Sequence, residues 1–278
     1  MRSTVTLAGG EVVPAMGLGT WHMGERIGDP NAEAIALQRG IDLGATLIDT
    51  AEMYARGGAE RVVAKAVKGR RDEVFIVSKV VPHNASRTGT IRACENSLSR
   101  LNIETIDLYL LHWPGPHPIR DTVAAFEELK KTGKIKYWGV SNFDTDDMND
   151  LWKVPGGTEC QTNQILYNLM RRGVEWDLLP WCSEHGVSVM AYSPLEQGRL
   201  LSNKRLRELS KQTGLSPSQL AIAWTLRKKD IISIPKASSL AHVEENVDAW
   251  DKILTQDIQL ELDKEFHPPE KKGTLDIL

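Results

Sequence analysis

The chain contains 278 residues and has a formal net charge of −3 at pH 7. This length fits one α/β barrel of about 250 residues, and because no linker or low-complexity stretch divides the sequence, we expect a single domain over residues 1–278. The near-neutral charge argues against nucleic-acid binding, and the lack of any apolar run approaching about 18 residues argues against a membrane span.

The first predicted element is a β-hairpin, formed by residues 4–7 (TVTL) and 11–13 (EVV) around the turn residues Gly9 and Gly10. A hairpin before the first barrel strand could close the bottom of the barrel. Buried parallel strands read as continuous apolar runs. Eight such runs follow, at residues 15–19, 46–49, 74–79, 106–111, 135–140, 160–164, 187–192 and 231–234.

Segments with helical periodicity alternate with these strands. Asp29 and Ser216 each precede a proline, which is typical of a capped helix start. The helices are expected at residues 30–43, 58–67, 87–101, 120–132, 144–152, 175–185, 216–228 and 239–249, with two surplus helical segments at 203–213 and 255–265. This alternation predicts an α/β fold, a (β/α)8 TIM barrel with an N-terminal β-hairpin and two extra helices.

Several of the apolar runs end on a polar side chain. Asp49, Lys79 and His112 end or directly follow three successive strands, and Tyr54 lies in the loop after Asp49. The active residues of a parallel barrel lie at the carboxyl ends of its strands. The pattern therefore places these four residues together in a candidate catalytic site.

These side chains can support more than one chemistry. A lysine at a buried strand end can be a Schiff-base nucleophile or an electrostatic partner. A tyrosine hydroxyl has an ordinary pKa near 10, and an adjacent ammonium would lower the pKa of Tyr54 and make it a workable acid. His112 could donate to a carbonyl oxygen and orient it. The structural alternative, an Asp49–Lys79 ion pair with a core histidine, is disfavoured because all four residues occur together.

Eight short motifs are spread over nearly the whole chain: GLGTW (17–21), LIDTAEMY (47–54), VSKV (77–80), DLYLLHWP (107–114), GVSNF (139–143), CQTNQ (160–164), AYSPL (191–195) and IPK (234–236). In this order and spacing, they resemble the aldo-keto reductase family. The resemblance implies that Tyr54 is the proton donor, that Lys79 and Asp49 tune it electrostatically, and that His112 positions the carbonyl.

The same resemblance implies an NADPH site. Ser141, Asn142 and Gln164 would hold the nicotinamide carboxamide, which needs paired donors and acceptors, and Tyr192 would stack on the ring. The remaining cofactor-binding positions would be Ser193, Leu195, Lys236, Ser238, His242, Glu245 and Asn246.

One of these positions departs from the family pattern, because many members have arginine where this chain has His242. A 2′-phosphate is best held by a bidentate guanidinium, whereas histidine is mostly neutral at pH 7. NADPH is still favoured, since Lys236 and Ser238 remain as phosphate partners. NADH is left open as an alternative cofactor.

The substrate pocket is expected at Trp21, Val80 and Trp113, beside Tyr54 and His112. The loops after strands four and seven are short, which favours an open site for small carbonyl compounds. The final stretch, HPPEKKGTLDIL (267–278), is similar to the tail of compact bacterial reductases that act on methylglyoxal and related aldehydes. It could fold over the mouth of the barrel.

The leading interpretation is an NADPH-dependent carbonyl reductase. A class I aldolase using Lys79 is an alternative, although a tight pair with Asp49 would keep that lysine charged. A non-enzymatic nucleotide-binding regulatory subunit is another, although an intact Tyr54 and Lys79 argue against it. A metal-dependent hydrolase is least favoured, because no His-x-His pair ends the first strand and Lys79 would repel a cation, so no metal site is expected.

The cellular setting is also only an expectation from sequence. Cys94, Cys160 and Cys182 are far apart and form no CxxC pair, and no signal peptide is visible. We therefore expect a cytoplasmic monomer that acts on a small carbonyl substrate, with no nucleic-acid or membrane partner.

Overall fold

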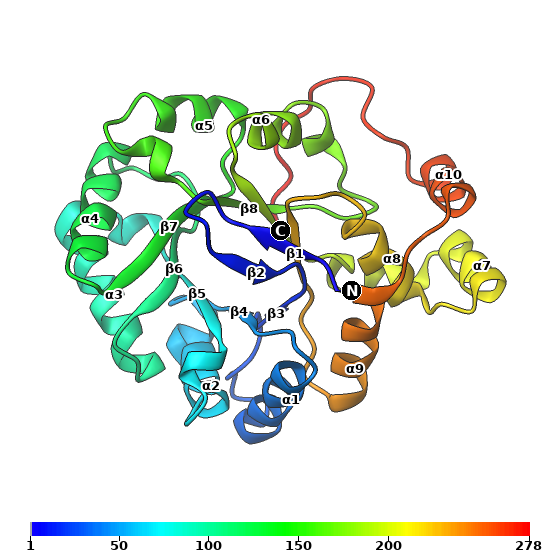
Figure 1. Ribbon diagram of the computed structural model, residues 1–278, viewed down its shortest axis with the longest axis horizontal. Coiled ribbons are helices and arrows are strands. Elements are labelled where there is room, and N and C mark those ends of the chain that lie inside the picture. The colour runs from blue at the N-terminus through cyan, green and yellow to red at the C-terminus, as the bar shows by residue number, and fades with distance from the viewer. Residues whose placement is uncertain (1) are drawn as a thin grey trace.

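Eight parallel strands surround the centre of the molecule in the computed structural model, which describes residues 2–278 (Figure 1). Each strand pairs with its neighbour along the chain, and the bridges Met16–Ser233 and Gly19–Lys236 join the first strand to the last. The predicted TIM barrel is confirmed. Its strands are β3 (Gly17–Gly19), β4 (Leu47–Asp49), β5 (Phe75–Val80), β6 (Ile106–Leu111), β7 (Ile135–Ser141), β8 (Thr162–Leu166), β9 (Ser188–Tyr192) and β10 (Ile231–Ile234).

The seam between β3 and β10 depends on Gly19. A Cβ at this position would lie 2.9 Å from the carbonyl oxygen of Ile234, closer than a side chain can approach. With glycine, the Gly19 N–H donates to the carbonyl oxygen of Pro235 at 3.0 Å. The absence of a side chain thus lets the first and last strands approach and close the barrel.

Helices flank the strands, as the sequence predicts. The side chains of Asp29 and Ser216 accept hydrogen bonds from the N–H groups of Asn31 and Gln219, which confirms both predicted caps. The helices of the barrel are α1 (Pro30–Asp42), α2 (Gly58–Ala66), α3 (Arg87–Leu101), α4 (Ile119–Lys131), α5 (Thr145–Trp152), α6 (Leu178–Glu184), α8 (Pro217–Thr225) and α9 (Leu240–Asp248). The two surplus segments form α7 (Lys204–Thr213) and α10 (Gln256–Glu265).

The predicted hairpin consists of the antiparallel strands β1 (Thr4–Thr6) and β2 (Val12–Pro14). Figure 1 shows it lying across one end of the barrel. Val5 and Val13 are buried in one cluster with side chains that point into the barrel, such as Leu108 and Met190. The hairpin therefore closes the end of the barrel at which the strands begin.

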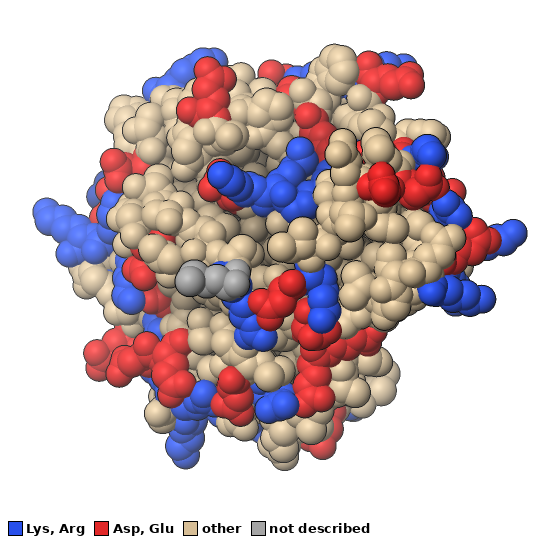
Figure 2. Space-filling view, turned by 45° about the vertical axis from the view of Figure 1, so that its right-hand side comes forward, with Lys and Arg blue, Asp and Glu red and all other residues tan. Residues whose placement is uncertain are grey.

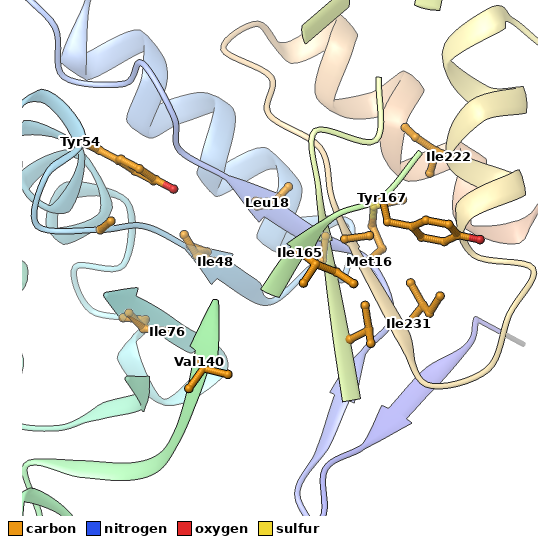
Figure 3. Close-up of a cluster of buried hydrophobic side chains, with 14 of the residues drawn as sticks. Met16, Leu18, Ile48, Tyr54, Ile76, Val140, Ile165, Tyr167, Ile222 and Ile231 are labelled. Atoms are coloured by element: carbon orange, nitrogen blue, oxygen red, sulfur yellow. The ribbon is translucent and has the colours of Figure 1, made fainter. Parts of the chain in front are cut away.

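Side chains alternate along each strand between the barrel interior and the layer beneath the helices. In β5, Val77 belongs to the interior cluster, whereas Ile76 and Val80 belong to the outer one. Figure 3 draws Ile76 among the side chains of this outer cluster. The expectation that Val80 lines the substrate pocket is therefore wrong. Because Lys79 faces the interior, its neighbour Val80 must face the helices, where it is fully buried.

The sixth strand of the barrel, β8, also differs from the expectation of 160–164. It begins only at Thr162, since residues 157–159 form a 3-10 turn. The side-chain amide of Gln161, between the turn and the strand, donates to the carbonyl oxygen of Glu159 at 2.7 Å. The strand then extends to Leu166. This shift brings Gln164 to the middle of the strand.

The surface of the molecule carries both signs of charge. Figure 2 shows acidic and basic side chains interspersed over the face that it presents. Among the helices of residues 2–278, none is long and apolar enough to cross a bilayer. Within the same residues, no group of His, Cys, Asp and Glu has an arrangement suited to a metal ion.

Candidate active site

A cavity of about 920 Å³ opens at the carboxyl ends of the strands. Lys79 lies behind its wall, Ser238 lies beside Lys236 with 3.4 Å between Oγ and Nζ, and Val80 lies elsewhere. The other sequence-predicted residues all line the cavity: Trp21, Asp49, Tyr54, His112, Trp113, Ser141, Asn142, Gln164, Tyr192, Ser193, Leu195, Lys236, His242, Glu245 and Asn246.

Lys79 is the centre of the predicted catalytic group. It is fully buried, and its ammonium donates to Asp49 Oδ2 at 2.8 Å, to the carbonyl oxygen of Thr50 at 2.8 Å and to the Tyr54 hydroxyl at 3.2 Å. An ammonium has three N–H donors, so all three are used. Tyr54 extends inward from the segment after β4, with its hydroxyl toward the barrel (Figure 3). The fold thus joins three of the four predicted residues directly.

The pKa of Tyr54 differs from the value expected from the sequence. Burial raises the pKa of Tyr54 well above 10, and the charge of Asp49 raises it further. The pKa of Tyr54 is thus raised and not lowered as expected, because burial and the charge of Asp49 outweigh the ammonium of Lys79. Burial also lowers the pKa of Lys79, against the charges of Asp49 and Glu60, which raise it. Tyr54 therefore holds its proton at neutral pH.

His112, which follows β6, completes the group. Its ring lies edge-on to that of Tyr54, with 5.7 Å between the ring centres. Burial, followed by the charge of Lys79, lowers the pKa of His112 well below 6.5, so the ring is neutral at pH 7. Among the described residues, none hydrogen-bonds to its buried Nδ1. A neutral imidazole carries one N–H group, so the ring can donate one hydrogen bond while keeping its proton.

Four amide or hydroxyl side chains gather here: Ser141 and Asn142 at the end of β7, Gln164 within β8 and Tyr192 at the end of β9. Asn142 donates to the carbonyl oxygen of His112 at 3.0 Å and accepts from the Tyr192 hydroxyl at 2.9 Å. Ser141 Oγ donates to the carbonyl oxygen of Gln164 at 2.8 Å. The network fixes donors and acceptors beside the catalytic group, and the ring of Tyr192 forms part of the cavity wall.

The far end of the cavity lies between the end of β10 and helix α9. Lys236 is exposed there, and the His242 N–H is capped by Ser239 Oγ at 3.3 Å. Glu245 accepts from Ser218 Oγ at 2.6 Å. A cationic lysine, a histidine and a carboxylate thus line the same cavity as Ser141, Asn142 and Gln164.

The family model described as the aldo/keto reductase family matches residues 15–264. The chain belongs to the aldo/keto reductase family. It is 48% identical to the methylglyoxal reductase YeaE of Escherichia coli, over 100% of this chain and 99% of the relative. It is 33% identical to the glyoxal reductase of Bacillus subtilis, over 92% of this chain and 90% of that protein.

A solved structure gives the same result for the fold. The crystal structure of an aldo-keto reductase from Klebsiella pneumoniae in complex with NADPH is 47% identical to this chain, covers 100% of both chains and superposes with a TM-score of 0.97. The protein is thus an aldo/keto reductase, and the oxidoreductase class predicted from its motifs is confirmed.

Two tryptophans flank the catalytic group of this aldo/keto reductase. The ring centre of Trp21 lies 4.8 Å from that of Tyr54, and Trp113 lies 4.8 Å from His112. Both line the cavity, as predicted. Met53 also lines the cavity. It was not predicted, although it directly precedes Tyr54 in the sequence.

The tail of this aldo/keto reductase reaches the cavity, as expected from its sequence. Ile277 and Leu278 line the wall, and the Leu278 N–H donates to the Tyr192 hydroxyl at 3.4 Å. Asp276 of the tail also forms an ion pair of 3.4 Å with Arg171. The residues predicted for the site did not include Ile277 and Leu278, because no local pattern shows which residues of the tail reach the cavity wall.

Sequence reasoning also missed what holds the segment after β9. Glu196 is completely buried and accepts from Asn168 Nδ2 at 2.7 Å and from Arg171 Nε at 3.1 Å. Ser193 and Gln197 in this segment line the cavity with positive φ angles of 49° and 54°. Left-handed backbone at non-glycine residues persists only where surroundings enforce it, and Glu196 supplies that constraint.

The buried His112 leads to a prediction about pH. In the native protein the ring stays neutral, whereas in the unfolded chain it takes up a proton below about pH 6.5. The free energy of unfolding should therefore fall with pH from about 6.5 downward, by up to about 1.4 kcal/mol per pH unit. Urea unfolding at several pH values should give a shallower pH dependence for His112→Gln. An unchanged pH dependence would mean that His112 is protonated in the native state.

Proposed function

We propose that this protein catalyses the NADPH-dependent reduction of small aldehydes, ketones and dicarbonyls, such as methylglyoxal, to alcohols. The observation that carries the proposal is the position of the Tyr54 hydroxyl, 3.2 Å from the buried Lys79 ammonium in the wall of a cavity. The names of the methylglyoxal reductase and glyoxal reductase relatives support the substrate class.

The donors that line the cavity fit NADPH. Ser141, Asn142 and Gln164 have the donors and acceptors that a carboxamide needs, and Tyr192 offers an aromatic face. When bound, the cofactor supplies a hydride to the carbonyl carbon. Ser193 and Leu195 would line the pyrophosphate path, and the adenosine phosphate would lie near the following residues: Lys236, Ser238, His242, Glu245 and Asn246.

The proton for the carbonyl oxygen comes from Tyr54. Because its pKa is raised by burial, Tyr54 carries its proton at neutral pH and can act as the acid. Lys79, held by Asp49 at 2.8 Å, stabilises the tyrosinate that forms as the proton leaves. The neutral His112 donates to the carbonyl oxygen and holds it near Tyr54.

The side chains around this group favour a small substrate. Trp21, Met53 and Trp113 supply apolar walls, and Ile277 and Leu278 of the tail line the same cavity. A substrate must fit among these side chains with its carbonyl oxygen near Tyr54. Small aldehydes and dicarbonyls meet this requirement.

One assay tests the whole proposal. Purified protein is given NADPH or NADH, separately, with a panel of small aldehydes and dicarbonyls, and the loss of cofactor absorbance is followed. We expect turnover of methylglyoxal with NADPH. No turnover across the panel with either cofactor would favour a non-enzymatic nucleotide-binding subunit instead.

His242 provides a test of the adenosine end. His242→Arg should tighten NADPH binding with little effect on NADH, because a guanidinium would add a charge-assisted contact to the 2′-phosphate. Such a contact is worth roughly 1.5–3 kcal/mol, so the ratio of the two dissociation constants should change by about ten-fold or more. Fluorescence titration of both cofactors measures it. Equal changes for the two cofactors would place residue 242 away from the phosphate.

The aldolase alternative is weakened by the surroundings of Lys79. A Schiff-base lysine must present a neutral amine, whereas all three donors of this ammonium are engaged by Asp49, Thr50 and Tyr54.

We also propose that residues 1–278 act as a single domain, and that the protein works as a cytoplasmic monomer without nucleic-acid or membrane partners. Sedimentation at micromolar concentration tests the oligomeric state.

A further inference from the structure

The carboxylate of Asp49 has two partners, which come from different parts of the chain. Lys79 Nζ from β5 contacts Oδ2 at 2.8 Å, and Gln164 Nε2 from β8 donates to Oδ1 at 2.7 Å. Gln164 is 2% exposed and Asp49 is 3% exposed, so water does not compete for these oxygens. Each carboxylate oxygen of the catalytic group is thus held by one buried donor.

The Gln164 amide can serve two partners at once. Its NH2 group has two donor hydrogens and its oxygen is an acceptor. The only other contact recorded for Nε2 among the described residues is the weak acceptor Met190 Sδ, at 3.8 Å. Gln164 also lines the cavity. One hydrogen can therefore remain on Asp49 while the rest of the amide faces a ligand.

We propose that Gln164 is a positioning residue for proton transfer, which fixes the Asp49 carboxylate and thereby adjusts the strength of Tyr54 as an acid and base. The proposal rests on the reductase function given above and adds to it. The N–H of Gln164 stabilises the negative charge of Asp49, so Tyr54 is exposed to a weaker field. Without this donor, a buried carboxylate oxygen would lose its partner.

Other charged and titratable groups surround Tyr54. Among them, Asp49 is the carboxylate whose effect on the pKa of Tyr54 can be changed by Gln164. Tyr54 faces Asp49, Lys79, His112 and Tyr192, and the charge of Asp49 is the largest contribution to its raised pKa after burial. The charge of Glu60 in α2 also acts on Lys79 and raises its pKa. Its carboxylate is already bonded to Ser78 Oγ and to Arg100. Asp49 is therefore the carboxylate through which β8 can act on Tyr54.

The test is Gln164→Met, which keeps the length of the side chain and removes its N–H donors. Alcohol oxidation by NADP⁺ needs Tyr54 in its deprotonated form, so its rate rises with pH. We expect this rising limb to move to higher pH by about half a unit or more, because an unpaired Asp49 favours protonated Tyr54. With saturating NADPH, we expect methylglyoxal reduction to fall by about ten-fold, since Tyr54 becomes a weaker acid.

Ser141→Ala is the matched control, because Ser141 lies beside Gln164 but does not contact Asp49. It should weaken cofactor binding and leave the pH profile in place. If Gln164→Met does not fold, Gln164→Asn, which keeps the amide but shortens its reach, tests the same contact. A pH profile that stays in place in both Gln164 variants, at saturating cofactor, would overturn the proposal.

A second measurement needs no cofactor or activity. Urea unfolding of the Asp49→Asn, Gln164→Met and double variants should show that the two substitutions are not additive, because a neutral amide at position 49 no longer needs the donor. Additive effects would contradict the coupling. If the wild-type protein turned over no carbonyl at all, the proposed function would fail, whereas this cycle would still report on the Gln164–Asp49 contact.

Discussion

Tyr54→Phe should abolish carbonyl reduction and leave NADPH affinity nearly unchanged. In the proposed reaction the hydroxyl protonates the oxygen of the substrate, whereas the ring packs against Trp21 and His112. General acid catalysis is typically worth roughly 10²–10⁴-fold in rate, so we expect a loss in that range. Steady-state kinetics with methylglyoxal measures the loss, and fluorescence titration measures cofactor binding.

The two readouts separate the role of Tyr54 from a structural one. A phenylalanine preserves the aromatic contacts, so the melting temperature should change little. A variant with wild-type turnover would remove Tyr54 from the mechanism. A variant that lost both turnover and NADPH binding would show that the hydroxyl maintains the site and is not specifically the acid.

Lys79→Met should be equally damaging to turnover and should also destabilise the fold. The substitution removes the ammonium that would stabilise the tyrosinate in the proposed mechanism, and it leaves the carboxylate of Asp49 buried without its cationic partner. Breaking a buried ion pair by removing one partner typically costs about 3–5 kcal/mol. Urea unfolding should show a loss of that size, alongside the loss of methylglyoxal reduction.

The double variant Lys79→Met with Asp49→Asn controls for the buried charge. It should regain much of the lost stability, because no uncompensated carboxylate remains, but it should not regain activity. Treatment of the wild-type protein with substrate and borohydride tests the aldolase alternative directly. A covalent adduct at Lys79 in the mass spectrum would contradict the reductase proposal.

The order of strand and helix patterns along the sequence predicts much of the fold of this protein. Strands buried on both faces are apolar throughout, and proline and glycine mark several of the helix ends, so local sequence indicated the alternation that closes into a barrel. The polar residues Asp49, Lys79 and His112 stand out because each interrupts such a run. Their common position at strand ends was therefore enough to place them at one end of the barrel.

The orientation of Val80 was not predicted correctly from the sequence. Side chains alternate along a strand, and a buried strand is apolar on both faces, so composition alone does not distinguish the interior from the helix layer. Once Lys79 is known to face the interior, Val80 must face away. The alternation of side chains can be predicted from the sequence. Which residues of β5 face the interior follows only from the position of Lys79.

The remaining features depend on contacts between distant parts of the chain. Gln164 meets Asp49 across 115 positions, and the tail reaches Tyr192 across 86. The pKa of Tyr54 rises because burial outweighs the nearby ammonium, and burial is a property of the folded molecule. The sequence by itself determined the strands, the helices and the residue types at the strand ends. The tertiary structure decided which of those residues touch and how strongly they are desolvated, because both depend on packing between segments that have no local signal for one another.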